Sequence, residues 1–236
     1  NQKSGLFGGV KSSPEAASVR TPEENSDEIV WDDPFLEAGI RNALGRSDNE
    51  AITRTDISKI TALAVLGDSV VINDSELASE LQFAYNGVFL PDSQTPIEIP
   101  ERTVSLNDLA YFSNLKSLTL VVSGVEGFEG LENCTKLENL ALHGAGSADL
   151  APIALMHDLR SLYVEGNSLD YYDLEVIGTL TNLEHLSIPD YYGETDITPL
   201  GQLLKLKTLN LSGAKVTSIE PLSNLTQLKE LDLSYT

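Results

Sequence analysis

A leucine pattern that recurs six times along the chain constrains its fold more than any other feature. In each copy, a leucine is followed three residues later by a second leucine and two residues after that by another apolar residue. The first leucines are Leu115, Leu137, Leu159, Leu183, Leu206 and Leu228, at intervals of 22, 22, 24, 23 and 22 residues. Such a period is typical of a solenoid, in which each unit adds one short strand to a stack with a continuous core.

The segments between these strands share a second signal. Three of them place proline three residues after Asp or Ser, at Asp149 and Pro152, at Asp196 and Pro199, and at Ser218 and Pro221. Proline fixes a backbone angle suited to a short helical turn, and the preceding Asp or Ser can cap that turn. The chain is therefore predicted to be an α/β solenoid, with a curved parallel β-sheet and short helical or 3-10 turns on the convex side.

The first 60 residues carry no copy of the repeat. Residues 1–28 are rich in Ser, Glu, Gly and Pro and are predicted to be a flexible tether or a disordered chain end. Residues 29–60 are predicted to form a helical N-terminal cap. Asp33 and Pro34 can begin a helix with Leu36, Ile40 and Leu44 on one face, Gly45 can end it, and Thr55 is expected to cap a second helical turn.

The first repeat, residues 61–110, is longer than the others. Its surplus runs from about Val71 to Leu106 and contains two alternating segments, 81–85 and 87–90, across an Asn86-Gly87 turn signal. Such a pattern predicts an inserted β-hairpin. The remaining leucine-rich repeats then occupy residues 111–236.

Charge and composition exclude several classes of partner. The chain has 36 acidic against 15 basic side chains, for a formal net charge of −21. It should therefore repel nucleic acid and anionic lipid, and favour basic partners or cations, although an ordinary solvated acidic surface would look the same. No apolar run is long enough for membrane insertion by the folded body. The single cysteine, Cys134, sits at a repeat core position, and nothing suggests a metal or cofactor.

Two stretches carry a family resemblance. The run from Pro221 to Leu233, PLSNLTQLKELDL, resembles the repeat unit of internalin-type bacterial leucine-rich-repeat proteins, and the segment FLEAGIRNAL at 35–44 is similar to the helical cap of Gram-positive surface proteins. The resemblance implies a secreted or cell-surface-anchored protein, from a Gram-positive bacterium, that binds other proteins without a cofactor.

The chain also departs from that family in two respects. The turn position that is usually Asn in internalin repeats is here Ser123, Ala145 or Ala214, with Asn167 the exception. The sequence also stops at Thr236, just past a strand and without a polar cap. We therefore expect either a missing C-terminal part or an edge that pairs with something, which includes edge-mediated self-association.

Strand alternation predicts which residues face the concave side of the sheet. They lie between the strand leucines, and in the first repeats they include Ser117, Thr119, Val121 and Ala141. Further along, the concave face and its rim carry side chains suited to anchoring a protein partner, since tyrosine combines a large contact area with a polar tip. The predicted ligand-binding residues are His143, Tyr163, Glu165, His185, Tyr191 and Tyr192.

The function expected from these features is an extracellular binding or adhesion module that recognises a protein or glycan through its repeat face, and not an enzyme. One alternative is a targeting or scaffold region of a larger polypeptide. Another is an intracellular regulatory leucine-rich-repeat protein. A hydrolase using His143 or His185 would need a nucleophile within hydrogen-bond reach of the histidine, which strand positions alone do not supply.

Overall fold

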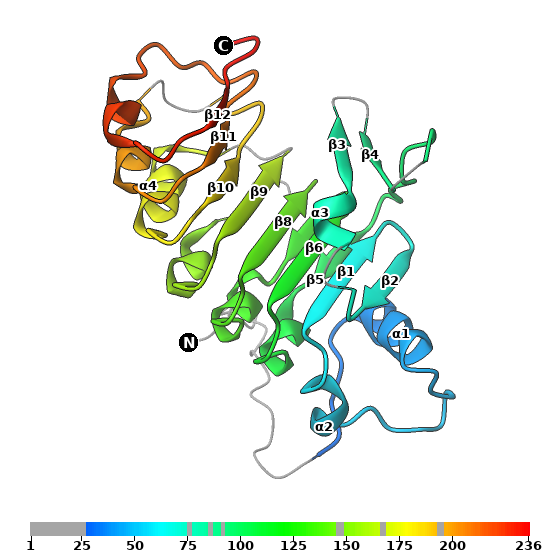
Figure 1. Ribbon diagram of the computed structural model, residues 1–236. Helices are drawn as coiled ribbons and strands as arrows, with labels where there is room; N and C mark the ends of the chain where they lie inside the picture. Colours follow the sequence, from blue (N-terminus) through cyan, green and yellow to red (C-terminus); the bar gives the residue numbers. More distant parts are fainter. Residues whose placement is uncertain are drawn as a thin grey trace, which may run out of the picture.

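The computed structural model describes residues 27–74, 77–84, 87–90, 93–144, 149–165, 169–192 and 196–236. One eight-stranded sheet runs through this part of the chain, with seven parallel strands side by side (Figure 1). In order across the sheet they are β1 (Ala62–Leu66), β6 (Ser117–Val121), β8 (Asn139–His143), β9 (Ser161–Glu165), β10 (His185–Ser187), β11 (Thr208–Asn210) and β12 (Glu230–Asp232). The predicted parallel solenoid sheet is confirmed.

The register of the sheet follows the leucine repeat. Leu118, Leu140 and Leu162 lie opposite one another on β6, β8 and β9, and the row continues through Leu186, Leu209 and Leu231. A shift by one residue would turn every leucine of a strand to the opposite face. The near-constant repeat length therefore sets which side chains lie on each face of the sheet.

Short helical segments return the chain behind the sheet. Five are 3-10 helices: η1 (Asn107–Tyr111), η2 (Phe128–Asn133), η3 (Ala151–Leu155), η4 (Thr198–Gln202) and η5 (Glu220–Asn224). As predicted, Asp149, Asp196 and Ser218 accept hydrogen bonds from the backbone N–H two residues ahead, at 2.8, 2.8 and 3.2 Å. Each bond stabilises the turn into its helix.

One return is a full α-helix. The repeat after β9 is longer than its neighbours, and its return contains α4 (Tyr171–Thr179), which begins with a capping box between Asp170 and Asp173. Asp173 also accepts a hydrogen bond from the backbone N–H of Leu150, at 3.2 Å, and so connects α4 to the preceding repeat. Tyr171 and Tyr172 are the first two residues of this helix.

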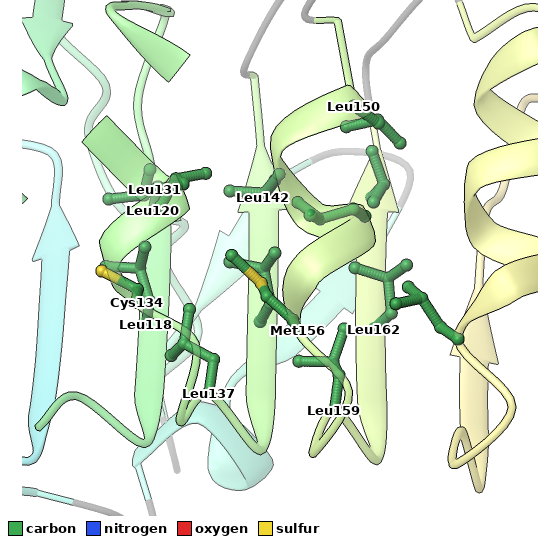
Figure 2. Close-up of a cluster of buried hydrophobic side chains, with 14 of the residues drawn as sticks. Leu118, Leu120, Leu131, Cys134, Leu137, Leu142, Leu150, Met156, Leu159 and Leu162 are labelled. Atoms are coloured by element: carbon green, nitrogen blue, oxygen red, sulfur yellow. The ribbon is translucent and has the colours of Figure 1, made fainter. Parts of the chain in front are cut away.

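The core lies between the sheet and the returns and is built from the repeat leucines. Each repeat adds one further core residue, three positions before the leucine that opens the repeat. Figure 2 shows Cys134 and Met156 at this register position, packed among Leu118, Leu137 and Leu159. Cys134 is fully buried, and burial raises the pKa of its thiol to about 12. The thiol is therefore protonated at neutral pH, which confirms its predicted packing role.

The cap follows the predicted pattern with one correction. Helix α1 (Pro34–Ala43) begins at the predicted Asp33 cap, whose side chain accepts hydrogen bonds from the backbone N–H groups of Phe35 and Leu36. Gly45 follows the helix with φ of +65°. Helix α2 (Arg54–Ile57) is capped by Thr53 and not by Thr55, because Thr53 forms a reciprocal capping box with Asp56.

Most of the predicted tether, residues 1–28, lies outside the described residues. Its last two positions do not behave as a tether. Arg54 donates its backbone N–H to the carbonyl oxygen of Asp27 at 2.8 Å, and Glu28 forms an antiparallel bridge with Thr53. The ordered cap therefore begins by Asp27 and pairs with the segment that leads into α2.

The inserted hairpin is confirmed as β3 (Gln82–Ala84) paired antiparallel with β4 (Gly87–Phe89), although the turn itself, 85–86, lies outside the described residues. The insert also contains α3 (Leu77–Glu80). Three further strands were not predicted: β2 (Ser69–Ile72) pairs antiparallel with β1, and β5 (Thr103–Ser105) pairs in parallel with β7 (Gly124–Glu126).

The insert folds back over the start of the concave face, where α3 lies against the sheet at β1 and β6 (Figure 1). Leu77, Leu81 and Val88 of the insert form a second apolar cluster with Ala64, Leu66 and Val121 of the sheet. Four residues expected on an open concave face, Ser117, Thr119, Val121 and Ala141, are buried, and Val121 belongs to this cluster. The open part of that face is thus confined to the later strands.

Arg102 holds the end of the insert in place. Its guanidinium donates to the Asp68 carboxylate at 2.8 Å and to the carbonyl oxygen of Gly67 at 2.6 Å, and it lies 3.4 Å from the centre of the Phe35 ring. Its backbone N–H also donates to the Ser123 hydroxyl at 2.8 Å. One side chain therefore joins the insert, the β1–β2 turn and helix α1.

Candidate functional site

A groove of about 480 Å³ lies on the concave face over β9, β10, β11 and β12. We call it the concave groove. Its floor is the strands and one wall includes Leu81 of the insert, so segments far apart in sequence enclose it. Its lining residues are Leu81, Ser161, Leu162, Tyr163, His185, Leu186, Ser187, Thr208, Leu209, Asn210, Glu230, Leu231 and Asp232.

Two of the six predicted ligand-binding residues line this groove. Tyr163 on β9 is half-buried, and the exposed His185 on β10 lies one strand away. The Nδ1 atom of His185 is 2.9 Å from the Thr208 hydroxyl on β11, which fixes the imidazole against the floor. A histidine and a tyrosine held on rigid strands provide hydrogen-bonding and ring-stacking contacts for a ligand.

The other predicted residues lie elsewhere. His143 and Glu165 face each other in register on β8 and β9, but neither lines the concave groove, and the side chain of Glu165 is outside what the structure describes. Tyr192 is 62% exposed beside the turn after β10 and donates a hydrogen bond to Asp190 at 3.3 Å. Tyr192 therefore remains accessible, as expected for a rim residue.

The expectation that Tyr191 lies at the rim is wrong, because its side chain is 2% exposed and belongs to the core. Tyr191 follows strand residue Leu186 by five positions, and Ala214, also buried, follows Leu209 by the same interval. The same position is exposed at Ser123, five residues after Leu118. The repeat register alone therefore does not predict the burial of Tyr191.

Several groove residues were absent from the predicted set. Thr208, Asn210, Glu230 and Asp232 alternate outward along β11 and β12, so strand periodicity contains the signal for them. Leu81 could not be identified in this way, because its position depends on how the insert folds over the sheet.

The acidic end of the groove lies on β12. Glu230 and Asp232 are exposed, and the hydroxyl and backbone N–H of Ser234 lower the pKa of Asp232 by hydrogen bonding. Asp232 is therefore ionised at neutral pH. On the adjacent strand, Asn210 accepts the corresponding hydrogen bond from the backbone N–H of Ser212, at 2.8 Å.

Charged side chains also connect neighbouring repeats beside the start of the strands. Glu184 accepts hydrogen bonds from Lys207 and from Arg160, the latter at 2.8 Å, and these bonds lower its pKa. Lys116 and Glu138 form a similar pair at 2.9 Å between two earlier repeats. These exposed pairs make only small contributions to stability, but they engage basic side chains outside the groove.

A second hollow, of about 590 Å³, lies between η4 and η5 on the returns. Polar residues of the two turns line it, including Asp196, Thr198 and Glu220, and no aromatic or histidine side chain is among them. It therefore lacks the anchoring side chains that the concave groove has. Among the described residues, no cluster of three or more His, Cys, Asp or Glu side chains is arranged to hold a metal ion.

No helix in the described part of the chain has the length and apolar character needed to cross a membrane. This observation concerns the helices alone.

Comparisons with known proteins agree with the architecture. A family model described as two copies of leucine-rich repeats matches residues 204–236. The structure of internalin C2 from Listeria monocytogenes is similar over 85% of this chain and 83% of the other, with 23% identity and a TM-score of 0.56. None of the curated proteins matched the chain.

Two further solved structures align less closely. Internalin F from the same organism covers 86% of this chain and 69% of its own, with 25% identity and a TM-score of 0.46. A leucine-rich-repeat protein of Leptospira interrogans covers 54% and 33%, with 24% identity and a TM-score of 0.46. The repeat spacing, the parallel sheet and the likeness to internalin C2 together show that this chain has the leucine-rich-repeat solenoid fold.

Proposed function

We propose that this chain is a binding module that holds a partner protein in the concave groove. The single observation that carries the proposal is the groove itself, formed where the insert leaves the later strands open and lined by Tyr163 and His185. Its volume is in the range of well-formed binding sites, which is about 300–1,000 Å³. His143 and Tyr192 extend the contact surface around it, and we propose that Glu165 joins them from its position beside His143 in the strand register.

The groove is built for recognition more than for chemistry. Its polar side chains stand on hydrogen-bonded strands of the sheet, and β9, β10 and β11 pair with a neighbour on each side. These side chains are therefore held in place before a partner arrives, which lowers the entropic cost of binding. The Nδ1 atom of His185 lies 2.9 Å from the Thr208 hydroxyl, and this contact holds the imidazole ring against the floor of the groove, where its other edge can meet a partner. Binding is therefore the activity that the groove supports best.

We also propose that the protein acts outside the cell, secreted or anchored at the surface of a Gram-positive bacterium. Support comes from the resemblance of its repeat unit and helical cap to internalin-type surface proteins. It also comes from the fold shared with internalin C2 of Listeria monocytogenes.

Capture experiments with matched variants test the binding proposal. The double variant Tyr163→Ala, His185→Ala is expected to lose at least about nine tenths of the partner that the native protein captures from surface extracts. The reason is that truncating an anchor residue costs about 2 kcal/mol or more at typical interfaces. The amount captured is measured by quantitative mass spectrometry.

The control is Tyr172→Ala, His157→Ala, which removes the same two residue types from exposed positions outside the groove. It should capture as much as the native protein. Equal capture by the groove variant and the native protein, with both shown to be folded, would contradict the proposal.

A further inference from the structure

The concave groove carries negative charge from carboxylates and no positive charge from lysine or arginine. Its lining residues include two carboxylates, Glu230 and Asp232, together with hydroxyl and amide groups, but no lysine or arginine. The nearby Lys207 is directed instead to Glu184. With a net charge of −21, the rest of the chain adds to this negative potential.

The two carboxylates have no counter-charge within the described part of the chain. Neither Glu230 nor Asp232 forms an ion pair there, although both are exposed at the end of the groove. They lie on one strand, two residues apart, and so project to the same face of the sheet. A cation in the groove would meet both.

The shape of the groove favours an extended segment. Four strands at a spacing of about 4.8 Å span roughly 14 Å, which is the length of about four residues of extended chain. One wall is apolar at Leu81, and the floor offers hydrogen-bonding groups from Ser161, Thr208 and Asn210. Lysine and arginine suit such a site, because their aliphatic stems can pack on apolar surface while the charged ends reach a carboxylate.

We propose that the concave groove binds an extended, cationic segment of the partner protein, with a lysine or arginine side chain seated against Glu230 and Asp232. This inference rests on the proposed function and adds to it the chemistry of the partner. Leu81 and Tyr163 contact the apolar parts of the segment, and the two carboxylates select its charge.

Selection from a phage-displayed library of random peptides tests the inference on the full chain. Peptides retained by the native protein should be enriched in lysine and arginine relative to the unselected library. For the tightest selected peptide, fluorescence anisotropy should show that Glu230→Gln, Asp232→Asn raises Kd about tenfold or more. Binding should also weaken as salt rises, because the screening length falls from about 10 Å at 0.1 M to about 3 Å at 1 M.

The substitutions preserve shape, and Asn at position 232 can still accept the Ser234 hydrogen bond. The matched control, Glu129→Gln, Glu132→Gln, makes the same change in net charge at two exposed positions on η2. Its Kd should stay within about twofold of the native value, since those sites lie outside the groove.

Two outcomes would overturn the inference in distinguishable ways. Selected peptides that lose affinity for Tyr163→Ala, His185→Ala but show no basic enrichment would refute the cationic partner while leaving the groove as the binding site. Selected peptides that bind this variant as tightly as the native protein would refute both the inference and the proposed function.

Discussion

Replacing Gly130 with alanine is expected to lower the free energy of unfolding by about 3 kcal/mol or more, an unusually large effect for one added methyl group. A Cβ atom at this position would lie 1.9 Å from the carbonyl oxygen of Leu106 and 2.7 Å from its carbonyl carbon. Both are backbone atoms of the preceding return, so no side-chain rotation can relieve the overlap. The two returns, η1 and η2, would have to separate.

Gly45→Ala is the control for this substitution. Gly45, unlike Gly130, has a positive φ of +65°, and a Cβ atom there would meet nothing within 4 Å. The substitution should therefore lower the free energy of unfolding only because alanine disfavours a positive φ, which costs about 1 kcal/mol. Urea denaturation followed by circular dichroism compares the two variants, and equal losses of stability would show that close stacking of the returns is not what requires glycine at position 130.

Asp108→Ala is the second substitution expected to have a large effect, at about 2–4 kcal/mol. Asp108 is 1% exposed, and its two carboxylate oxygens accept hydrogen bonds from the backbone N–H groups of Asp32 and Asp33, each at 2.8 Å. These N–H groups precede α1, 75 residues earlier in the chain. Alanine would leave both donors without their acceptor and weaken the attachment of the cap to the first return.

Asp108 is also expected to make the free energy of unfolding depend on pH. Burial raises the pKa of Asp108 from 3.8 to about 6, against the effect of the two backbone hydrogen bonds, and the neighbouring carboxylates of Asp32 and Asp33 raise it further. The folded protein therefore holds this proton more tightly than the unfolded chain does. Tighter proton binding by Asp108 contributes to the free energy of unfolding. This contribution is fully present below about pH 4 and is lost as the pH rises through about 6.

Asp108→Ala removes this titration, so the difference in unfolding free energy between native protein and variant should be larger near pH 4 than near pH 7. The change in that difference is on the order of 2–3 kcal/mol, because one pKa unit corresponds to about 1.4 kcal/mol. Urea titrations of both proteins at the two pH values measure it. If the difference stays constant, or grows toward neutral pH, then the pKa of Asp108 is not raised in the folded protein.

The sequence predicts the repetitive part of this fold because one physical rule sets it. Each strand leucine must reach the shared core, so a regular interval between leucines determines strand positions, register and face together. The same register correctly places Cys134 in the core. It does not predict the burial of Tyr191, because the equivalent turn residue Ser123 is exposed.

The parts that the sequence could not predict depend on contacts between distant segments. The Asn86-Gly87 signal predicts a hairpin but not the surface on which the insert packs. That packing covers Val121 and brings Leu81 to the groove, 80 residues before β9. The extent of the candidate site was therefore set by a tertiary contact that strand alternation does not encode.

Site-specific photo-crosslinking tests most directly whether the concave groove is the binding surface. A benzophenone amino acid is placed singly at Tyr163, at His185 or at the exposed control position Tyr172, and each folded protein is irradiated with surface extracts. A partner held in the concave groove should give a crosslinked adduct of the same defined mass from positions 163 and 185 and none from position 172. Adducts from position 172 alone would contradict it and place the partner on the returns.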